Sequence, residues 1–326
     1  MPLVVKLKRF VPPLSSSLHK GQAGRVGVVG GSFEYTGAPY YAAVSALRTG
    51  ADLCHVFCAK DASVVIKSYS PELVVHPLMR TQQDFGGNKP SDADLERIVD
   101  QMGPTLARID SLVVGPGLSR DPVMLATAAR IIRRAISLKI HLVIDADGLV
   151  ALERYPDVLK GSDNVVITPN YNEFRRLCET FGIDYEGDLD MLARRMSRQL
   201  GNVTVLHKGE ADVVALGDRM MLCTRQGSPR RCGGQGDVLA GVLGTFLAWT
   251  NGFKTGRWYE CDSTNPQAPA DAADLLPISA YLCAYGASRL VRECALAAYE
   301  KRKRSMVTSD VIEEIGPVFS RIFDGE

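Results

Sequence analysis

Hydrophobic residues fall in short, β-rich runs that are separated by longer segments with helical periodicity. The runs cover residues 25–31, 51–57, 110–118, 141–149, 164–170 and 203–209. Helical segments between or after them include 38–50, 122–138, 170–181 and 188–200. Near-continuous apolar strands between helices indicate a mostly parallel central sheet with helices on both faces. The pattern therefore predicts an α/β fold.

The pattern changes from about residue 212. Two short runs, 212–218 and 219–226, meet near Gly217 and Asp218, which predicts a hairpin at the sheet edge. Helices are expected at 274–302 and 309–320, and the polar stretch 251–273 is expected to be an exposed insertion. No linker composition interrupts the chain, so we predict a single domain over residues 1–326 with a loose segment at 1–20.

Small, polar or charged residues follow the predicted strands. They are Gly30-Gly31-Ser32, Gly115-Pro116-Gly117, Asp145-Ala146-Asp147, Thr168-Pro169-Asn170 and Lys208-Gly209-Glu210. In open α/β sheets the ligand lies beyond the carboxyl ends of the strands. We therefore expect these residues to line one site.

The loop with Gly233, Gly234 and Gly236 precedes Asp237 and an apolar helix. Glycines let backbone N–H groups converge on an anion, and the positive end of the helix dipole adds to the attraction. Asp237 could cap that helix, which stabilises by about 0.5–2 kcal/mol, or act as a general base. A helix that is apolar nearly all round is buried, which favours the base.

Two common nucleotide motifs are absent from the sequence. The glycine loop has no Lys followed by Ser or Thr after its last glycine, so it is not a Walker P-loop. The stretch GVVGGSFEYTG has the wrong spacing for the dinucleotide fingerprint G-x-G-x-x-G. Any phosphate must therefore be bound in another way.

Charge and cysteine content narrow the class of protein. A net charge of +1 from 38 basic and 37 acidic residues gives no field that would draw nucleic acid or a membrane surface. The 8 cysteines are scattered, without C-x-x-C or zinc spacing, which suggests buried thiols in a reducing compartment. We expect a cytoplasmic protein. Mitochondria are the less favoured alternative, because Pro12 and Pro13 would break the amphipathic helix of a transit peptide.

Seven motifs in order carry a family resemblance: GGSFEYTGAPYYAAVSALRTGADL, SPELVVHP, VVGPGLSRDP, VIDADGL, TPNYNEFRRL, HKGEAD and RRCGGQGDVLAG. From about residue 20 to 300 the chain resembles the NAD(P)H-hydrate dehydratases of the ribokinase-like superfamily. The resemblance implies a three-layer α/β/α sandwich. It also implies a repair enzyme that restores NADH and NADPH from the S epimers of NADH hydrate and NADPH hydrate.

In the implied reaction ATP phosphorylates the hydroxyl of the hydrate, and phosphate then leaves. RRCGGQGD resembles the ATP-using eukaryotic branch rather than the shorter G-T-G-D loops of ADP-using relatives. The chain has no room for the epimerase domain fused to many bacterial relatives, so epimerisation would belong to a separate protein. A kinase for a small hydroxymethyl compound and a non-catalytic dinucleotide sensor are the alternatives. The sequence leaves a homo-oligomer open.

The resemblance also implies roles for individual residues. Asp237 would be the catalytic base. Substrate contacts would come from Gly117, Asn170, Tyr171, Asn172, Glu173, Phe174, Arg175, Arg176 and Asp237, with Tyr35, Thr36 and Ala38 as weaker candidates. ATP contacts would come from Lys208, Gly209, Glu210, Ala211, Asp212, Gly227, Ser228, Pro229, Arg230, Arg231, Cys232, Gly233, Gly234, Gln235 and Gly236.

Several of these residues also have a purely structural interpretation. Gly117 could form a strand-to-helix turn, and Asn170 could cap a helix. Glu173 and Arg176 could form a surface ion pair, and Lys208 could be a solvated loop lysine. For Mg²⁺, which prefers few protein carboxylates, the candidates are Asp145, Asp147 and Glu173, although one aspartate could instead cap the next helix.

Overall fold

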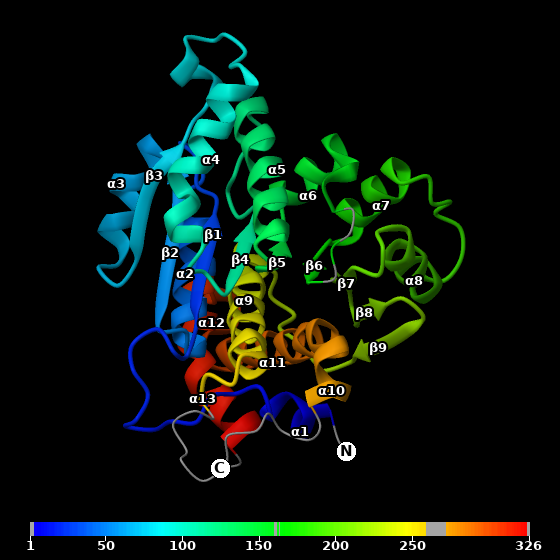
Figure 1. Cartoon of the computed structure of the whole chain (residues 1–326). Helices are drawn as coiled ribbons and strands as arrows, with labels where there is room; N and C mark the ends of the chain where they lie inside the picture. The colour runs from blue at the N-terminus through cyan, green and yellow to red at the C-terminus, as the bar shows by residue number, and fades with distance from the viewer. Residues whose placement is uncertain (1–2, 160–161, 163, 259–271, 325–326) are drawn as a thin grey trace.

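The computed structural model describes residues 3–159, 162, 164–258 and 272–324. Within these residues a nine-stranded sheet has the order β3-β2-β1-β4-β5-β6-β7-β8-β9 (Figure 1). The strands are β1 (Arg25–Val29), β2 (Leu53–Ala59), β3 (Val74–Met79), β4 (Ser111–Val114), β5 (His141–Ile144), β6 (Val165–Ile167), β7 (Thr204–His207), β8 (Asp212–Leu216) and β9 (Arg219–Cys223). Strands β1 to β7 pair in parallel, and β8 and β9 add an antiparallel hairpin. Both the parallel sheet and the hairpin are confirmed.

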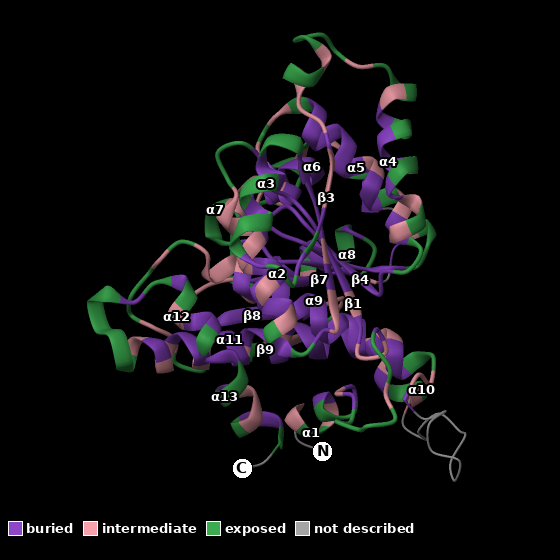
Figure 2. Cartoon of the chain, turned by 90° about the vertical axis from the view of Figure 1, so that its left-hand side faces the viewer, coloured by how far each residue is buried: buried purple, intermediate pink, exposed green. Residues whose placement is uncertain are grey.

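Helices cover both faces of the sheet. One face carries α4 (Asp92–Leu106), α5 (Pro122–Ser137), α6 (Asp147–Arg154), α7 (Tyr171–Thr180) and α8 (Leu189–Gln199). The other carries α2 (Gly37–Thr49), α9 (Gln235–Lys254), α11 (Ser279–Arg302), α12 (Thr308–Glu313) and α13 (Ile315–Phe319). Side chains of β4 alternate between the two cores, with Val113 in one and Leu112 and Val114 in the other. The fold is the expected three-layer α/β/α sandwich, whose central strands, such as β4, β5 and β6, are buried on both faces (Figure 2).

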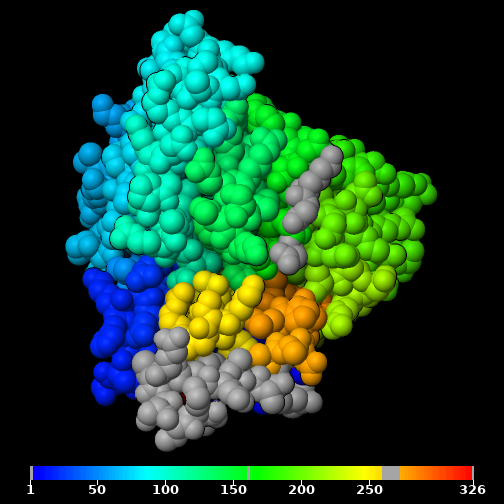
Figure 3. Space-filling model, viewed as in Figure 1, coloured from blue at the N-terminus to red at the C-terminus, as the bar shows by residue number. Residues whose placement is uncertain are grey.

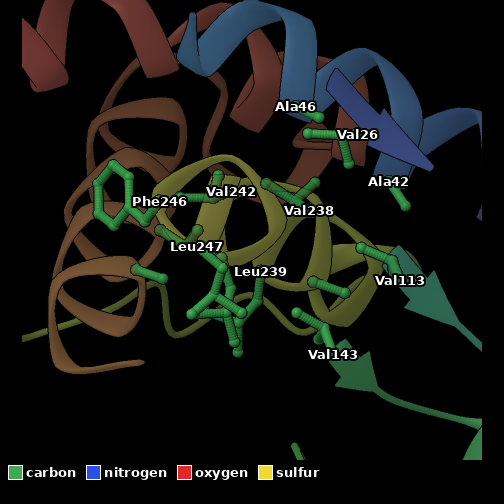
Figure 4. Close-up of a cluster of buried hydrophobic side chains, with 14 of the residues drawn as sticks. Val26, Ala42, Ala46, Val113, Val143, Val238, Leu239, Val242, Phe246 and Leu247 are labelled. Carbon is green, nitrogen blue, oxygen red and sulfur yellow. The ribbon is translucent and has the colours of Figure 1, made fainter. Parts of the chain in front are cut away.

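Helix α9 is the central helix of its layer. It is buried from Val238 to Ala248 without a break, and Val113 and Val143 of the sheet face it (Figure 4). Gly241 allows close approach to α2, because a Cβ there would lie 2.0 Å from the Ala42 carbonyl oxygen. The expectation of a buried helix after Asp237 is confirmed.

The N-terminal segment is packed where it was expected to be loose. Helix α1 (Leu3–Lys8) places Leu7 in the core at 3% exposure, and the Phe10 ring meets Phe253 edge to face at 5.1 Å. Apolar side chains at positions 7 and 10 explain the difference, because they complete the core under α9 and α11. Residues 13–17 are exposed.

The stretch 251–273 does not begin as an exposed insertion. Helix α9 continues to Lys254, and Phe253 and Trp258 are buried, with the Trp258 ring over Gly252. Residues 259–271 lie outside the described part of the chain. The expected helix at 274–302 is α11, preceded by α10 (Ala272–Leu275), and the one at 309–320 is divided into α12 and α13.

A buried ion pair lies at the amino ends of the strands, on the side of the sheet opposite the predicted site. It connects the residue before β4 with the chain that follows α9. Arg257 donates two hydrogen bonds to Asp110, with Nη2–Oδ1 2.6 Å and Nη1–Oδ2 3.0 Å. Asn251 and the backbone N–H of Arg25 also donate to Asp110. The N-terminal segment (blue) and the end of α9 (yellow) lie side by side at the lower end of the molecule (Figure 3).

Among the described residues, the helices are too short or too polar to cross a lipid bilayer.

Candidate functional site

A cleft with a volume of 780 Å³ opens at the carboxyl ends of the strands, between the β7–β8 turn, residues 224–232, the start of α9 and the side of α11. Of the residues predicted to contact ATP, the lining contains Lys208, Gly209, Glu210, Asp212, Gly227, Ser228, Pro229, Arg231, Cys232, Gln235 and Gly236. Ala211, Arg230, Gly233 and Gly234 were predicted too but are not part of it. The structure thus brings two separate motifs together around one cavity.

Other lining residues were missed by the sequence analysis. They are Thr224, Arg225, Gln226, Leu239, Ser288, Val291, Arg292 and Ala295, together with Asn170, which was predicted to contact substrate instead. Four of them come from α11, which carries no recognisable motif. Arg292 donates to the carbonyl oxygens of Gly209, Glu210 and Arg225 and so fixes the cleft wall.

Asp212 shapes the cleft through its hydrogen bonds. Its carboxylate accepts from Gly209 N at 2.9 Å, Ser288 Oγ at 2.7 Å and Arg292 Nη1 at 2.9 Å. These bonds join the β7–β8 turn to α11. A buried carboxylate with all its partners inside the protein stabilises the wall rather than offering a free ligand.

The glycine loop ends in the N-cap of α9. Gly234 occupies that position with φ 100°, and the helix begins at Gln235. Asp237 is therefore the third residue of the helix, and no side chain makes the capping hydrogen bond. The interpretation of Asp237 as the cap is wrong, because the left-handed Gly234 makes the turn three residues earlier.

Asp237 combines partial burial with neighbouring charges of both signs. The pKa of its carboxyl is raised to about 8, chiefly by burial and in part by the Asp145 carboxylate, whereas the Lys208 ammonium opposes the shift. A pKa near the working pH suits a group that accepts and returns a proton. Its place in the first turn of α9 puts it at the positive end of the helix dipole.

Lys208 links the strand ends to the start of α9. Its Nζ lies 2.6 Å from Asp145 Oδ1 and 3.9 Å from Glu173 Oε2. Burial disfavours its charge, but Asp145, Glu173 and Asp237 outweigh burial and raise its pKa. A Cβ on Gly236 would lie 3.5 Å from Lys208 Nζ, so the ammonium abuts the loop. With only 21% of the side chain exposed, Lys208 is not a solvated loop lysine.

The segment 170–176 forms the first turns of α7. Asn170 caps the helix by accepting from Asn172 N and Glu173 N, and the Glu173 carboxylate accepts from Asn170 N at 2.8 Å. The structural interpretation of Asn170 as a cap is thus confirmed. Burial raises the pKa of Glu173, and Lys208 opposes the shift.

Two side chains of this segment have partners that the sequence did not indicate. Arg176 does not pair with Glu173, because its Nε donates to Glu153 of α6 at 2.9 Å. Phe174 is fully buried against His207, so its side chain anchors α7 and does not face the cleft. The other side chains of the segment are partly or fully exposed: Tyr171, Asn172, Arg175 and Arg176.

Gly117 lies beside the loop that follows β1. It has φ 62°, and a Cβ would lie 2.7 Å from the Tyr35 carbonyl oxygen. This close approach supports the interpretation as a turn, while a substrate contact stays a prediction. Thr36 Oγ1 lies 2.9 Å from Tyr69 Oη, and Ala38 is in the first turn of α2.

The two aspartates of VIDADGL have different partners. Asp145 Oδ1 accepts from Lys208 and from Thr168 Oγ1, whereas Asp147 Oδ2 accepts from Ser119 N. Ala146 between them has φ 48°, an unusual conformation for a residue with a Cβ. Ala146 is also the N-cap of α6, so neither aspartate caps that helix. The described residues contain no group of three or more His, Cys, Asp or Glu arranged to hold a metal ion.

Comparison with known proteins agrees with this geometry. The chain matches the family model of NAD(P)H-hydrate dehydratase over residues 26–317. It is 53% identical over 321 residues to the ATP-dependent (S)-NAD(P)H-hydrate dehydratase of Batrachochytrium dendrobatidis, covering 98% of both chains. It is 42% identical to the human protein of the same name, covering 98% of this chain and 84% of that one.

Solved structures share the fold. The ADP/ATP-dependent NAD(P)H-hydrate dehydratase of Bacillus subtilis, co-crystallised with ATP and Mg²⁺, superposes with a TM-score of 0.66 at 18% identity, covering 98% of this chain and 97% of that one. A ribokinase-like superfamily protein from Enterococcus faecalis V583 gives 0.70 at 19% identity, covering 98% and 94%. With the family match over most of its length, the chain belongs to the NAD(P)H-hydrate dehydratases.

Proposed function

We propose that the 780 Å³ cleft holds ATP and that Asp237 takes the proton from the hydroxyl of the substrate. The named activity of the relatives gives the reaction: ATP-dependent dehydration of the S epimers of NADH hydrate and NADPH hydrate. The observation that carries the assignment is Asp237 itself. Its carboxyl has a pKa raised to about 8, in the first turn of a buried helix beside the cleft.

Charged and apolar residues both line the cleft. Lys208, Gly236 and the positive end of α9 lie together, which suits the transferring phosphate. Leu239, Val291 and Ala295 supply apolar surface, which suits the nucleotide base. We propose that ATP binds with its terminal phosphate toward Asp237.

The reaction then has two steps. The substrate hydroxyl attacks the terminal phosphorus, its proton passes to Asp237, and the bond from phosphorus to the bridging oxygen of ATP breaks to release ADP. The carbon–oxygen bond of the new phosphate ester then breaks, a proton leaves the neighbouring ring carbon, and phosphate departs as the double bond re-forms. Backbone N–H groups and Lys208 stabilise the charge on the transferring group.

Magnesium enters this proposal as a partner of ATP. Asp145 has one carboxylate oxygen engaged by Lys208 and Thr168, and its Oδ2 lies 3.7 Å from the position of a Gly236 Cβ. One carboxylate beside a phosphate site fits Mg²⁺, which keeps waters and phosphate oxygens as its other ligands. Asp145 would therefore be the protein carboxylate nearest to the ion, which neutralises phosphate charge when bound.

Further expectations accompany the assignment. We propose that residues 1–326 act as one catalytic domain in the cytoplasm, without nucleic-acid or membrane partners. A separate epimerase would supply the S epimer. A homo-oligomer is compatible with this arrangement.

The test is incubation of purified protein with NADH hydrate, ATP and Mg²⁺ while absorbance in the reduced-nicotinamide band is followed. Recovery of the band with one phosphate released per NADH supports the proposal, and ADP in place of ATP tests the nucleotide. A stable phosphate ester without recovery would identify a kinase instead. Binding without turnover would identify a dinucleotide sensor.

A further inference from the structure

The glycine loop is held in place by a helix from near the C-terminal end of the chain. Thr308, the first residue of α12, is 2% exposed, and its Oγ1 donates a hydrogen bond to the Gly233 carbonyl oxygen. Its hydroxyl also lies 3.6 Å from Cys232 Sγ. None of the motifs recognised in the sequence includes residue 308.

This hydrogen bond sets the direction of a peptide group. In a planar trans peptide the carbonyl and the next N–H point in opposite directions. With the Gly233 carbonyl turned toward α12, the N–H of Gly234 is turned away from α12. For the described residues, no hydrogen bond engages the N–H groups of Gly234, Gln235 or Gly236.

Two side chains pack closely against the Gly234 α-carbon and so restrict the conformation of the glycine loop. A Cβ at Gly234 would lie 2.8 Å from Thr308 Oγ1 and 2.9 Å from Tyr41 Cδ2. Thr308 and Tyr41 therefore close on the glycine from two helices, α12 and α2. Gly234 is also the N-cap of α9, so its φ of 100° decides how the first turn, with Asp237, leaves the loop.

We propose that Thr308 is a positioning residue for phosphoryl transfer. Its hydroxyl holds the peptide between Gly233 and Gly234 so that the unengaged N–H groups at the start of α9 are preorganised for the transferring phosphate. Thr308 itself does not line the nucleotide cleft. Preorganised donors act on the transition state, so losing the hydroxyl lowers kcat and leaves nucleotide affinity nearly unchanged.

The test compares Thr308→Val, which keeps the shape and removes the hydroxyl, with Thr308→Ser, which keeps the hydroxyl. Thr245→Val is the matched control, because Thr245 is a buried threonine of α9 whose hydroxyl donates to the Ala46 carbonyl oxygen at 3.0 Å. Thr308→Val should lower kcat by about tenfold or more with KM for ATP changed less than about threefold. Thr308→Ser and Thr245→Val should stay within about threefold of the wild type.

The proposal rests on the proposed function, so a second measurement is independent of the hydrate. Calorimetry compares the affinity for ADP–Mg²⁺ alone with that for ADP–Mg²⁺ plus aluminium fluoride, which mimics a phosphoryl group in transfer. Thr308→Val should keep the first affinity and lose most of the gain from the fluoride, whether or not NADH hydrate is the substrate.

Three results would overturn the proposal: an unchanged kcat in Thr308→Val, an equal loss in Thr308→Ser, or an equal loss in Thr245→Val. An inactive wild type would instead contradict the proposed function and leave the calorimetric comparison to decide the role of Thr308.

Discussion

The ammonium group of Lys208 lies 2.6 Å from Asp145 Oδ1, and both charges of this ion pair act on the pKa of a third residue, Asp237. Asp145 raises the pKa of Asp237, and Lys208 lowers it. Burial sets the larger part of the shift, so Asp237 is a weak acid before any ligand arrives. Asp237 and the two groups that act on its pKa come from three separate elements: α9, the end of β5 and the end of β7.

Replacement of Asp237 tests its role as the base. Asp237→Asn should lower kcat by about 10³-fold, because the amide cannot accept the proton. Affinity for ATP should remain within about threefold, since the N–H groups and Lys208 are still present. Steady-state kinetics and calorimetry measure the two effects, with Asp218→Asn on the exposed hairpin turn as the control. Near wild-type turnover in Asp237→Asn would contradict the assignment.

The pH dependence follows from the pKa of the same carboxyl. Asp237 must be ionised to act as a base, and burial raises its pKa to about 8. We therefore expect kcat/KM for the hydrate to fall about tenfold per pH unit below pH 8 and to level off above it. Activity that is flat between pH 6 and pH 8 would show that another group takes the proton.

Variants of the two neighbours should move this profile in opposite directions. Asp145→Asn removes a negative charge and should shift the midpoint to lower pH, whereas Lys208→Gln removes a positive charge and should shift it to higher pH. The profiles are measured at saturating ATP, because Lys208→Gln should also weaken nucleotide binding. Shifts in the same direction would mean that the two charges do not act on Asp237 directly.

The raised pKa also predicts a dependence of stability on pH. The folded state holds the Asp237 proton up to about pH 8, whereas the unfolded chain releases it near pH 4. The stability from this group is therefore present at acid pH and lost as the pH rises toward 8. The free energy of unfolding of Asp237→Asn, taken relative to that of the wild type, should therefore rise by about 1–3 kcal/mol from pH 5.5 to pH 9.

Denaturant unfolding at the two pH values measures this gain. Asp218→Asn should show the same difference from the wild type at both values, because its side chain is 82% exposed. A gain in Asp237→Asn that shrinks with rising pH would contradict the sign of the shift.

The ion pair at the opposite edge of the sheet should matter for stability and not for chemistry. Arg257→Met leaves the buried Asp110 carboxylate without its bidentate partner and should cost about 3 kcal/mol. Arg198→Met, which breaks an exposed pair with Asp218, should cost less than about 0.5 kcal/mol. Urea unfolding measures both costs, and kcat well below the unfolding temperature should stay within about twofold. Equal costs would show that the Asp110 pair is not effectively buried.

Much of the fold could be predicted because the strands of a parallel sheet are continuous apolar runs. The hairpin was also predictable, since Gly217 takes the left-handed conformation that its turn requires. Strand β3 was missed, because His76 and Pro77 interrupt its apolar pattern at the sheet edge. The burial of Leu7 was not predicted, because it depends on tertiary contacts and polar residues surround it in the sequence.

The site was predictable where one motif supplies its residues. The β7–β8 turn and the glycine loop are such motifs, and most of their residues line the cleft. Arg292 could not be identified as a lining residue from the sequence, because it belongs to α11, and that helix carries no motif that indicates a site. The start of α9 was misplaced for another reason: it depends on the backbone conformation of Gly234, which composition does not determine.

The contact between Thr308 and Gly233 has a consequence for the order of synthesis. Residues 25 to 258 contain the whole sheet, Asp237 and most of the residues that line the 780 Å³ cleft, yet the glycine loop lacks its contact with α12 until residue 308 has been made. If Thr308 positions the loop as proposed, a nascent chain that has already folded its sheet on the ribosome still lacks this hydrogen bond and should turn over substrate slowly. Full activity would then require the last helices to emerge and dock.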